Sequence, residues 1–359
     1  MIDAAGGGPL YCFGTLCDIR SRICILICNL ICNLIRNTFA STSMTTDPNQ
    51  RFHGIYAATV CPLHADGSID ESALARHLTD VLAVDGIAGL LINGHAGENF
   101  MLSRAEKKRV VEIAGRVCTE IRDGNVILVC GINAEDSHEA QRHVEDAAEA
   151  GADAILIFPP FSWALAQDAD MALTHHRIAN ARSKMPMFLY QAGVRAGAMG
   201  YSPDVLRALV QLPYVVGVKE GSWESAAYEA NLRMIGEAAP DVAVMASGDE
   251  HLLTCFTVGS KGSLVSLACV APELIVGLDR AIAAGDMAAA RAWNARIYPL
   301  AKAIYGSAPG GHANARLKTC LKLLGRLAND TMRAPMGPLP EREVAMLRQA
   351  LHDAGYETT

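Results

Sequence analysis

A lysine at the end of an apolar segment is the feature of the sequence best suited to covalent chemistry. Residues 214–221 read Tyr-Val-Val-Gly-Val-Lys-Glu-Gly, and β-branched residues in such a run predict a strand buried on both faces. Ligands of parallel α/β sheets bind at the carboxyl ends of the strands, which is where Lys219 stands. Loss of solvation there would lower the pKa of its amine, and a neutral amine can form a Schiff base with a ketone. Alternatively, Lys219 extends to water or pairs with Glu220.

Three further groups follow other predicted strands. The hydroxyl of Tyr190, one βα unit before Lys219, could relay a proton to a carbonyl, or it could belong to a core tyrosine. Gly94 and Gly97 bracket a loop whose N–H groups could hold a carboxylate, although an ordinary turn has the same spacing. Arg195 could clamp a carboxylate or form a surface ion pair.

Composition narrows the class of protein. The 359 residues are 51% hydrophobic and 19% charged, which excludes overall disorder. The balance of 31 basic and 38 acidic side chains gives a net charge of −7, so nucleic acid is not an expected partner. The 11 cysteines form no C-x-x-C pair, and free thiols in a reducing, cytoplasmic compartment fit them best.

Residues 1–43 differ from the rest of the chain. The apolar run from Ile23 to Ile35 has arginines on both sides and is too short to span a bilayer. One interpretation is an unstructured or non-native extension, with translation beginning at Met44. The alternative is a targeting segment or an amphipathic anchor. We assign residues 1–50 to this extension.

From Gly54 onward, short apolar runs alternate with helical patterns. This alternation predicts eight parallel strands, each followed by a helix, and therefore a (β/α)8 barrel rather than a doubly wound open sheet. The expected strands are Gly54–Val60, Ile87–Asn93, Val126–Cys130, Ala154–Phe158, Met187–Gln191, Val215–Lys219, Val242–Ala246 and Ser263–Leu267.

Start signals place several of the helices. Ser103 and Glu106 have capping-box spacing before a helix reaching Ile121, Asp136-Ser137 precedes another over residues 138–150, and Ser202-Pro203 opens a third. No further strand pattern occurs from Met287 onward, and helices are expected there over residues 287–305, 312–327 and 341–354. We therefore divide the chain into a barrel over residues 51–285 and a helical segment over residues 286–359.

Several strand-end motifs together carry a family resemblance. From about Gly54 to its end, the chain resembles the dihydrodipicolinate synthase and N-acetylneuraminate lyase superfamily of class I aldolases. The matching motifs are Gly94-His95-Ala96-Gly97-Glu98 with Leu102 and Glu106, then Leu189-Tyr190, Gly217-Val218-Lys219-Glu220 and Ser247-Gly248-Asp249-Glu250.

The resemblance implies roles for these residues. It implies that Lys219 forms a Schiff base with pyruvate or another 2-oxo acid and that Tyr190 assists proton transfer. It implies substrate-binding residues as well, and we expect these to be Gly94, His95, Ala96, Gly97, Arg195 and Leu264. No metal or organic cofactor is implied. The expected partners are a 2-oxo acid, an aldehyde and further copies of the chain in a homotetramer or dimer, with no membrane for the barrel.

Two departures from the family pattern bear on the substrate. The loop commonly carries two hydroxyl residues where this chain has His95 and Ala96, so His95 is either a substrate contact or proton shuttle, or a structural residue. Pro160 and Phe161 replace a tyrosine pair of the synthase branch, and a Phe cannot carry a proton. Arg195 keeps an acidic second substrate possible.

These considerations favour a class I aldolase or lyase acting on a 2-oxo acid. A dehydratase or 4-hydroxy-tetrahydrodipicolinate synthase of the same superfamily is the alternative. Two rivals from other classes remain: a metal-dependent aldolase using His95, Glu98, Asp249, Glu250 and His251, and a non-enzymatic 2-oxo acid sensor.

Overall fold

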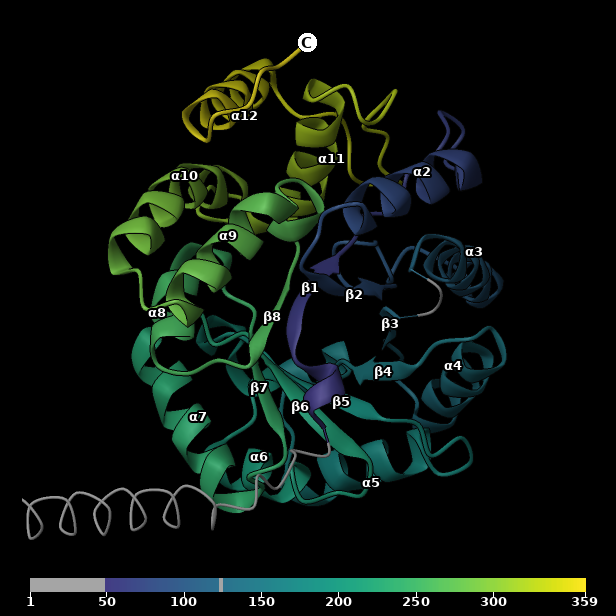
Figure 1. Cartoon of the computed structure of the whole chain (residues 1–359). Coiled ribbons are helices and arrows are strands. Elements are labelled where there is room, and N and C mark those ends of the chain that lie inside the picture. The colour runs from purple at the N-terminus through teal and green to yellow at the C-terminus, as the bar shows by residue number, and fades with distance from the viewer. Residues whose placement is uncertain (1–48, 123–124) are drawn as a thin grey trace, which may run out of the picture. The chain divides into compact units, whose positions relative to one another are not determined.

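Eight parallel strands close into a barrel in which each strand pairs with the next in chain order and β8 pairs with β1 (Figure 1). The structure is a computed structural model that describes residues 49–122 and 125–359. The strands are β1 (Gly54–Ala58), β2 (Ile87–Ile92), β3 (Ile127–Ile132), β4 (Ala154–Ile157), β5 (Met187–Gln191), β6 (Val215–Glu220), β7 (Ala243–Ala246) and β8 (Gly262–Val265). The predicted fold class is confirmed. All eight strands lie where the sequence placed them, and only their ends differ.

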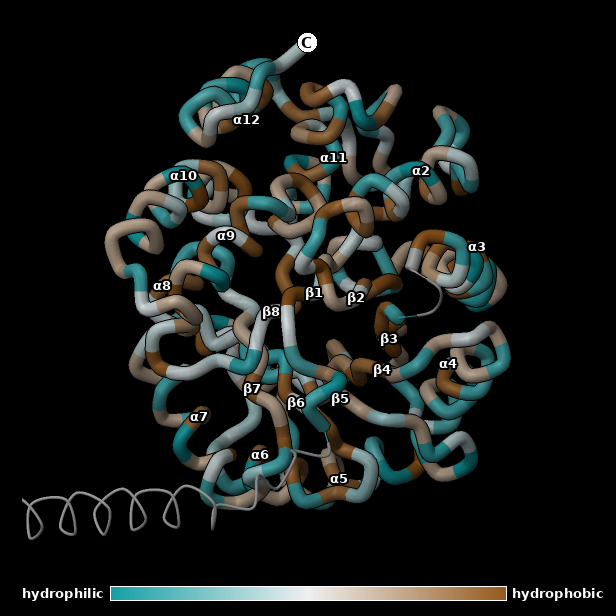
Figure 2. The backbone as a smooth tube through the Cα atoms, viewed as in Figure 1, coloured by the Kyte–Doolittle hydropathy of each residue, from teal (hydrophilic) through white to brown (hydrophobic). Residues whose placement is uncertain are grey.

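The barrel interior is filled by side chains from alternate strand positions. Tyr56, Leu91, Leu156, Phe188 and Met245 belong to one buried apolar cluster inside the barrel. Figure 2 shows many apolar residues along the central strands. Gly217 makes room for the Phe188 ring, because a Cβ at residue 217 would lie 2.5 Å from that ring. The barrel therefore has a solid apolar floor beneath the carboxyl ends of its strands.

A helix follows every strand, and the helices surround the barrel (Figure 1). They are α2 (Glu71–Leu82), α3 (Arg104–Arg122), α4 (Ser137–Glu149), α5 (Ala169–Ala179), α6 (Pro203–Leu209), α7 (Ser225–Ala238), α8 (Leu252–Thr257) and α9 (Pro272–Ala283).

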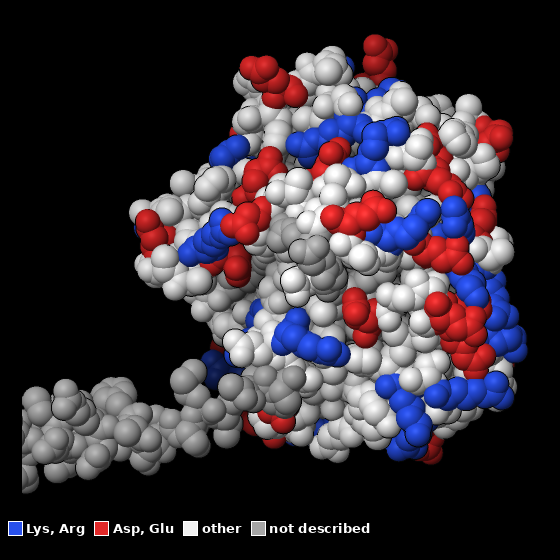
Figure 3. Space-filling view, turned by 45° about the vertical axis from the view of Figure 1, so that its right-hand side comes forward, with Lys and Arg blue, Asp and Glu red and all other residues white. Residues whose placement is uncertain are grey.

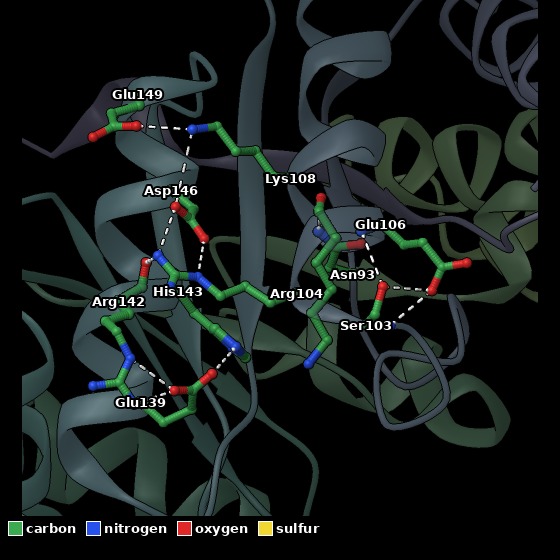
Figure 4. A network of polar contacts seen from close by, with 11 residues as sticks. Asn93, Ser103, Arg104, Glu106, Lys108, Glu139, Arg142, His143, Asp146 and Glu149 are labelled. Atoms are coloured by element: carbon green, nitrogen blue, oxygen red, sulfur yellow. Dashed lines mark hydrogen bonds and ion pairs between the residues drawn. The ribbon is translucent and has the colours of Figure 1, made fainter.

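On the face of the molecule shown in Figure 3, acidic and basic side chains stand side by side at the surface. Between α3 and α4, Arg104 Nη2 donates to Asp146 Oδ1 at 2.9 Å and Lys108 Nζ donates to Glu149 Oε2 at 2.8 Å (Figure 4). Exposed ion pairs of this kind each contribute about 0–1 kcal/mol to stability. Burial of apolar side chains therefore contributes far more to the stability of the fold than these pairs do.

The predicted helix starts are confirmed in atomic detail. Ser103 N donates to Glu106 Oε2 at 2.8 Å and Glu106 N donates to Ser103 Oγ at 3.3 Å, which completes the capping box of α3 (Figure 4). The Asp136 carboxylate accepts from Glu139 N at 2.8 Å, and the Ser202 hydroxyl accepts from Val205 N at 3.4 Å. These contacts satisfy N–H groups that the helices themselves leave free.

Three more helices follow the barrel: α10 (Met287–Tyr305), α11 (Ala313–Leu323) and α12 (Glu341–Asp353). They confirm the predicted helical tail. The division at residue 285 falls between α9 and α10 and stays a prediction. Short 3-10 turns complete the chain: η1 (Gln50–Phe52), η2 (Phe161–Ala164), η3 (Val194–Met199), η4 (Asp249–His251), η5 (Leu267–Cys269) and η6 (Gly310–His312).

The predictions for residues 1–43 lie outside the described residues. Within the assigned extension only Asn49 and Gln50 are described, and Gln50 begins η1. The six described cysteines are buried free thiols. No helix in residues 49–122 and 125–359 combines the length and apolar character that a membrane crossing needs.

Candidate active site

Lys219 projects from the carboxyl end of β6 into a cavity of about 290 Å³ at the mouth of the barrel. Only 8% of the residue is exposed. Burial lowers the pKa of its amine from 10.5 to about 8, and the nearby Asp249 carboxylate partly opposes this change. A fall of this size gives an appreciable fraction of neutral, nucleophilic amine near neutral pH.

The alternative partner of the lysine, Glu220, faces away from the cavity. Its carboxylate accepts from Asn231 Nδ2 at 2.7 Å and from the Ser222 hydroxyl at 3.0 Å. Successive residues of a strand point to opposite faces, so Lys219 and Glu220 diverge. The interpretation of Lys219 as a lysine paired with Glu220 or extended into water is wrong.

Tyr190 lies directly across from Lys219, because the two residues are partners in the β5–β6 register. The Lys219 Nζ atom is 5.7 Å from the centre of the Tyr190 ring. Burial raises the pKa of the Tyr190 hydroxyl to about 12, with the Glu220 carboxylate as a secondary cause. The phenol is therefore protonated at neutral pH and available as a proton donor beside the amine.

Asp249 supplies the other charged group of the cavity. It is buried in η4, and its Oδ1 atom accepts a hydrogen bond from Leu267 N at 2.9 Å. Burial raises the pKa of this carboxyl to about 7, while the Leu267 hydrogen bond and the Lys219 charge oppose the increase. The sequence analysis placed Asp249 in a family motif and considered it as a metal ligand, but gave it no role in the Schiff-base site.

The loop after β2 forms a compact turn against the same cavity. Gly97 N donates to Gly94 O and Glu98 N donates to His95 O, each at 3.0 Å. Of this loop, His95 and Ala96 line the cavity, whereas Gly94 and Gly97 shape the turn beside it. Burial lowers the pKa of His95 to about 3, with the Lys219 charge as a second cause. His95 is therefore a neutral imidazole at neutral pH.

Helix α11 holds this loop in place from the C-terminal segment. Asn314 Nδ2 donates to His95 O at 2.7 Å. Lys318 forms a fully buried ion pair with Glu98, and its Nζ also donates to Thr331 O at 2.9 Å. The backbone of Glu98 has a φ of 58°, a left-handed conformation that surrounding contacts must maintain. Glu98 orders the loop through the ion pair and takes no part in the cavity lining.

The structure brings most of the predicted site residues together. Lys219, Tyr190, His95, Ala96 and Leu264 all line the cavity. Arg195 instead lies exposed in η3 and lines a neighbouring cavity of about 310 Å³. The two cavities share Trp223 and Tyr305 as lining residues.

Sequence reasoning missed several lining residues: Phe100, Trp223, Ser266, Tyr305 and Asn314. Tyr305 and Asn314 come from the helical tail, and no local pattern marks them. Trp223 could have been predicted from the sequence, because it follows the strand of Lys219 by a few residues and so lies at the same end of the barrel. Its φ of 61° is unusual for a large side chain and is often found at functional sites.

The metal-dependent rival receives no support from the arrangement of ligands. Among the described residues, no group of three or more His, Cys, Asp or Glu side chains converges closely enough to hold a metal ion. Of the side chains considered for that role, Glu98 is taken up by its ion pair with Lys318.

The site thus combines a closed (β/α)8 barrel with a buried lysine and a facing tyrosine at the strand ends, and comparison with known proteins gives the family. A sequence model of the dihydrodipicolinate synthetase family matches residues 51–354. The chain therefore belongs to the dihydrodipicolinate synthetase family, a class of barrel lyases, and the family predicted from the sequence is confirmed.

Individual relatives agree with this result. The chain is 30% identical over 309 residues to the 4-hydroxy-tetrahydrodipicolinate synthase of Oleidesulfovibrio alaskensis, covering 85% of this chain and 99% of that protein. It is 32% identical over 305 residues to the enzyme of the same name from Phenylobacterium zucineum, covering 85% and 98%. Among solved structures, YagE of E. coli K12 in complex with pyruvate superposes with a TM-score of 0.76 at 23% identity, covering 85% and 99%. This last likeness shows the fold.

Proposed function

We propose that the protein is a class I aldolase or lyase that binds pyruvate or a related 2-oxo acid as a Schiff base on Lys219. The observation that carries the proposal is the contrast between two buried lysines. Lys318 forms an ion pair with Glu98. Lys219, in contrast, has a lowered pKa and lines a cavity large enough for a small substrate. A desolvated lysine beside a phenol is suited to attack a ketone.

In the first half of the reaction, the neutral Lys219 amine adds to the keto carbon of the acid. Tyr190 donates a proton to the departing oxygen, which leaves as water and produces a protonated imine. The carboxylate of the acid is held at the loop of Gly94, His95, Ala96 and Gly97. The hydrogen bond from Asn314 to the His95 carbonyl fixes the orientation of that loop.

In the second half, the protonated imine accepts the electron pair of the adjacent carbon–carbon bond. Cleavage releases an aldehyde and leaves an enamine, and condensation is the reverse step. Tyr190 relays the proton between the aldehyde oxygen and solvent. Phe161, in place of a tyrosine of the synthase branch, has no proton to contribute. After cleavage the enamine takes a proton at carbon to give the imine, and water then hydrolyses the imine, which releases the 2-oxo acid and returns Lys219 to its free form.

Condensation with an acidic aldehyde is the second candidate. Two observations favour it: curated relatives are named 4-hydroxy-tetrahydrodipicolinate synthase, and Arg195 lines the cavity next to that of Lys219. Dehydration of a 2-oxo acid would also use the imine of Lys219, and the geometry alone does not favour it over cleavage.

The test is reduction with borohydride in the presence of a panel of 2-oxo acids, followed by intact-protein mass measurement. We expect a stable mass increase that depends on pyruvate or a longer 2-oxo acid. Trapping of pyruvate alone supports cleavage or condensation, and trapping of longer keto acids alone supports dehydration. Absence of any adduct, with undiminished reversible binding of the acid, would support the sensor rival and contradict the proposal.

Assembly and location belong to the same proposal. We propose a homotetramer or dimer that acts in the cytoplasm, in keeping with the free buried thiols of Cys61, Cys118 and the other described cysteines. Sedimentation equilibrium tests the assembly, and a monomer over the working concentration range would contradict it.

A further inference from the structure

The Lys219 cavity offers a second substrate few charges. Of the side chains that line it, Lys219 and Asp249 are the pair that carries charge near neutral pH, because the pKa of His95 is lowered and those of Tyr190 and Tyr305 are raised. Once Lys219 has formed an imine with the 2-oxo acid, its positive charge lies on the protonated imine and is no longer available to pair with a second substrate. An aldehyde with its own carboxylate would then face Asp249 without a cation to pair with in this cavity, which is unfavourable.

Aromatic rings form one wall of the cavity mouth. His95 stacks on Phe158 with ring centres 4.2 Å apart and on Phe161 at 6.1 Å, and Phe100 meets Phe161 edge to face at 6.1 Å. Phe100 is 46% exposed and Phe161 42%, although both rings have aromatic neighbours. Such exposed rings beside a reactive amine can pack against a planar ligand.

A second aromatic pair lines the same cavity. The ring centres of Trp223 and Tyr305 lie 5.2 Å apart. Both residues line the Lys219 cavity and also the neighbouring cavity of Arg195, so they stand between the two. The left-handed backbone of Trp223, with a φ of 61°, is maintained in spite of its large side chain. The imidazole of His95 is neutral and leaves its Nε2 atom without a hydrogen-bond partner among the described residues.

The charged groups that could recognise an acidic aldehyde lie beyond Trp223. Arg195 and Lys302 line the neighbouring cavity, together with Glu224 and Glu250. Two basic and two acidic groups leave that cavity without a net charge. Lys302 lies 3.9 Å from Glu250, so part of its positive charge is already compensated.

We propose that the carbonyl compound released from, or added to, the lysine-bound 2-oxo acid is an aromatic aldehyde whose ring packs against the cavity-lining rings of Phe100, Phe161 and His95. This inference rests on the proposed Schiff-base function and specifies its second substrate. A cavity of about 290 Å³ is near the lower end of small-molecule sites, about 300–1,000 Å³, and suits a three-carbon acid with one ring.

The corresponding cleavage is balanced without any further reactant. In a 4-aryl-4-hydroxy-2-oxobutanoate bound to Lys219, the bond between carbons 3 and 4 breaks and its electron pair enters the protonated imine. The 4-hydroxyl becomes the aldehyde oxygen, and its proton passes through the Tyr190 hydroxyl to solvent. The enamine then takes a proton at carbon 3, and water releases pyruvate.

The test compares three aldehydes with pyruvate as the common partner: benzaldehyde, glyceraldehyde and the anionic succinic semialdehyde. Pyruvate consumption gives kcat/KM for each. We expect benzaldehyde to exceed the anionic aldehyde at least tenfold, and Phe161→Ala to lower kcat/KM for benzaldehyde by about tenfold or more while pyruvate-dependent borohydride trapping stays unchanged. Tyr298→Ala is the control, because this tyrosine is 47% exposed on α10 and does not line the cavity.

The outcomes separate the two levels of the proposal. Absence of a borohydride-trapped adduct with every 2-oxo acid of the panel would overturn the Schiff-base function itself, whereas trapping of longer keto acids without pyruvate would overturn the aromatic aldehyde alone. Intact trapping with a preference for succinic semialdehyde that Arg195→Ala removes would overturn the aromatic aldehyde alone. A Phe161→Ala protein that changes only its state of assembly would assign this ring to contacts between copies of the chain and would also overturn the inference.

Discussion

The reactivity of Lys219 follows from its burial and gives the most quantitative prediction. A pKa of about 8 instead of 10.5 corresponds to about 3 kcal/mol in favour of the neutral amine. At pH 7 about one Lys219 side chain in ten would be neutral, against about one in 3,000 for a lysine with the ordinary value. The gain is about 300-fold in the concentration of nucleophile.

Asp249 allows the electrostatic part of this argument to be tested. Its carboxyl has a pKa of about 7, so it is mostly ionised over the range in which Lys219 titrates, and its negative charge favours the ammonium form. Asp249→Asn removes the charge while its amide oxygen can still accept from Leu267 N. We therefore expect the pKa of Lys219 to fall further in this variant.

Competitive acetylation followed by peptide mass spectrometry measures the titration without requiring turnover. The labelling rate of Lys219 should reach half of its plateau near pH 8 in the wild-type protein and at lower pH in Asp249→Asn. The exposed Lys261 provides the internal reference in each digest. A wild-type midpoint near 10.5, or an upward displacement in Asp249→Asn, would refute the reasoning.

Other expected outcomes concern proton transfer, stability and metals. Tyr190→Phe should form the pyruvate adduct with Lys219 more slowly but to the same final extent, and should lower kcat by about 10²–10⁴-fold, the usual contribution of a general acid; loss of the adduct even at equilibrium would assign Tyr190 to binding instead. Lys318→Met should lower the free energy of unfolding in urea by about 3–5 kcal/mol, because it leaves Glu98 buried without its partner. The matched change Lys322→Met, which breaks a half-exposed pair on the same helix, should cost about 0–1 kcal/mol, and equal losses in the two variants would contradict the argument from burial. Prolonged treatment with a chelator should leave activity unchanged, whereas loss of activity and its return with a divalent metal would favour the metal-dependent rival.

The barrel could be predicted because its determinants are local. Apolar runs of strand length, capping residues such as Ser103 with Glu106, and Pro203 at a helix start each act within a few residues. Since parallel strands end at one edge of the barrel, the position of Lys219 beside Tyr190 followed from the order of the strands. Because successive side chains of a strand point to opposite faces, a Lys219 that faces the cavity also predicts a Glu220 that faces away from it.

The parts of the site that escaped prediction depend on how distant segments pack. Tyr305, Asn314 and Lys318 reach the cavity and its loop only because α10 and α11 lie against the barrel mouth. Arg195 was expected among the groups that bind the substrate of Lys219, but η3 carries it into the neighbouring cavity. Neither outcome is encoded in residue spacing, because each is fixed by tertiary contacts.

The most direct test of the central claim is a peptide map of the protein after borohydride reduction with pyruvate. A neutral, buried amine that captures the keto carbon predicts one modified peptide, containing Lys219, and no adduct in Lys219→Ala. The buried Lys318 should stay unmodified because it is paired with Glu98, donates to Thr331 O and does not line the cavity. An adduct on any other lysine, or an undiminished adduct in Lys219→Ala, would contradict the account.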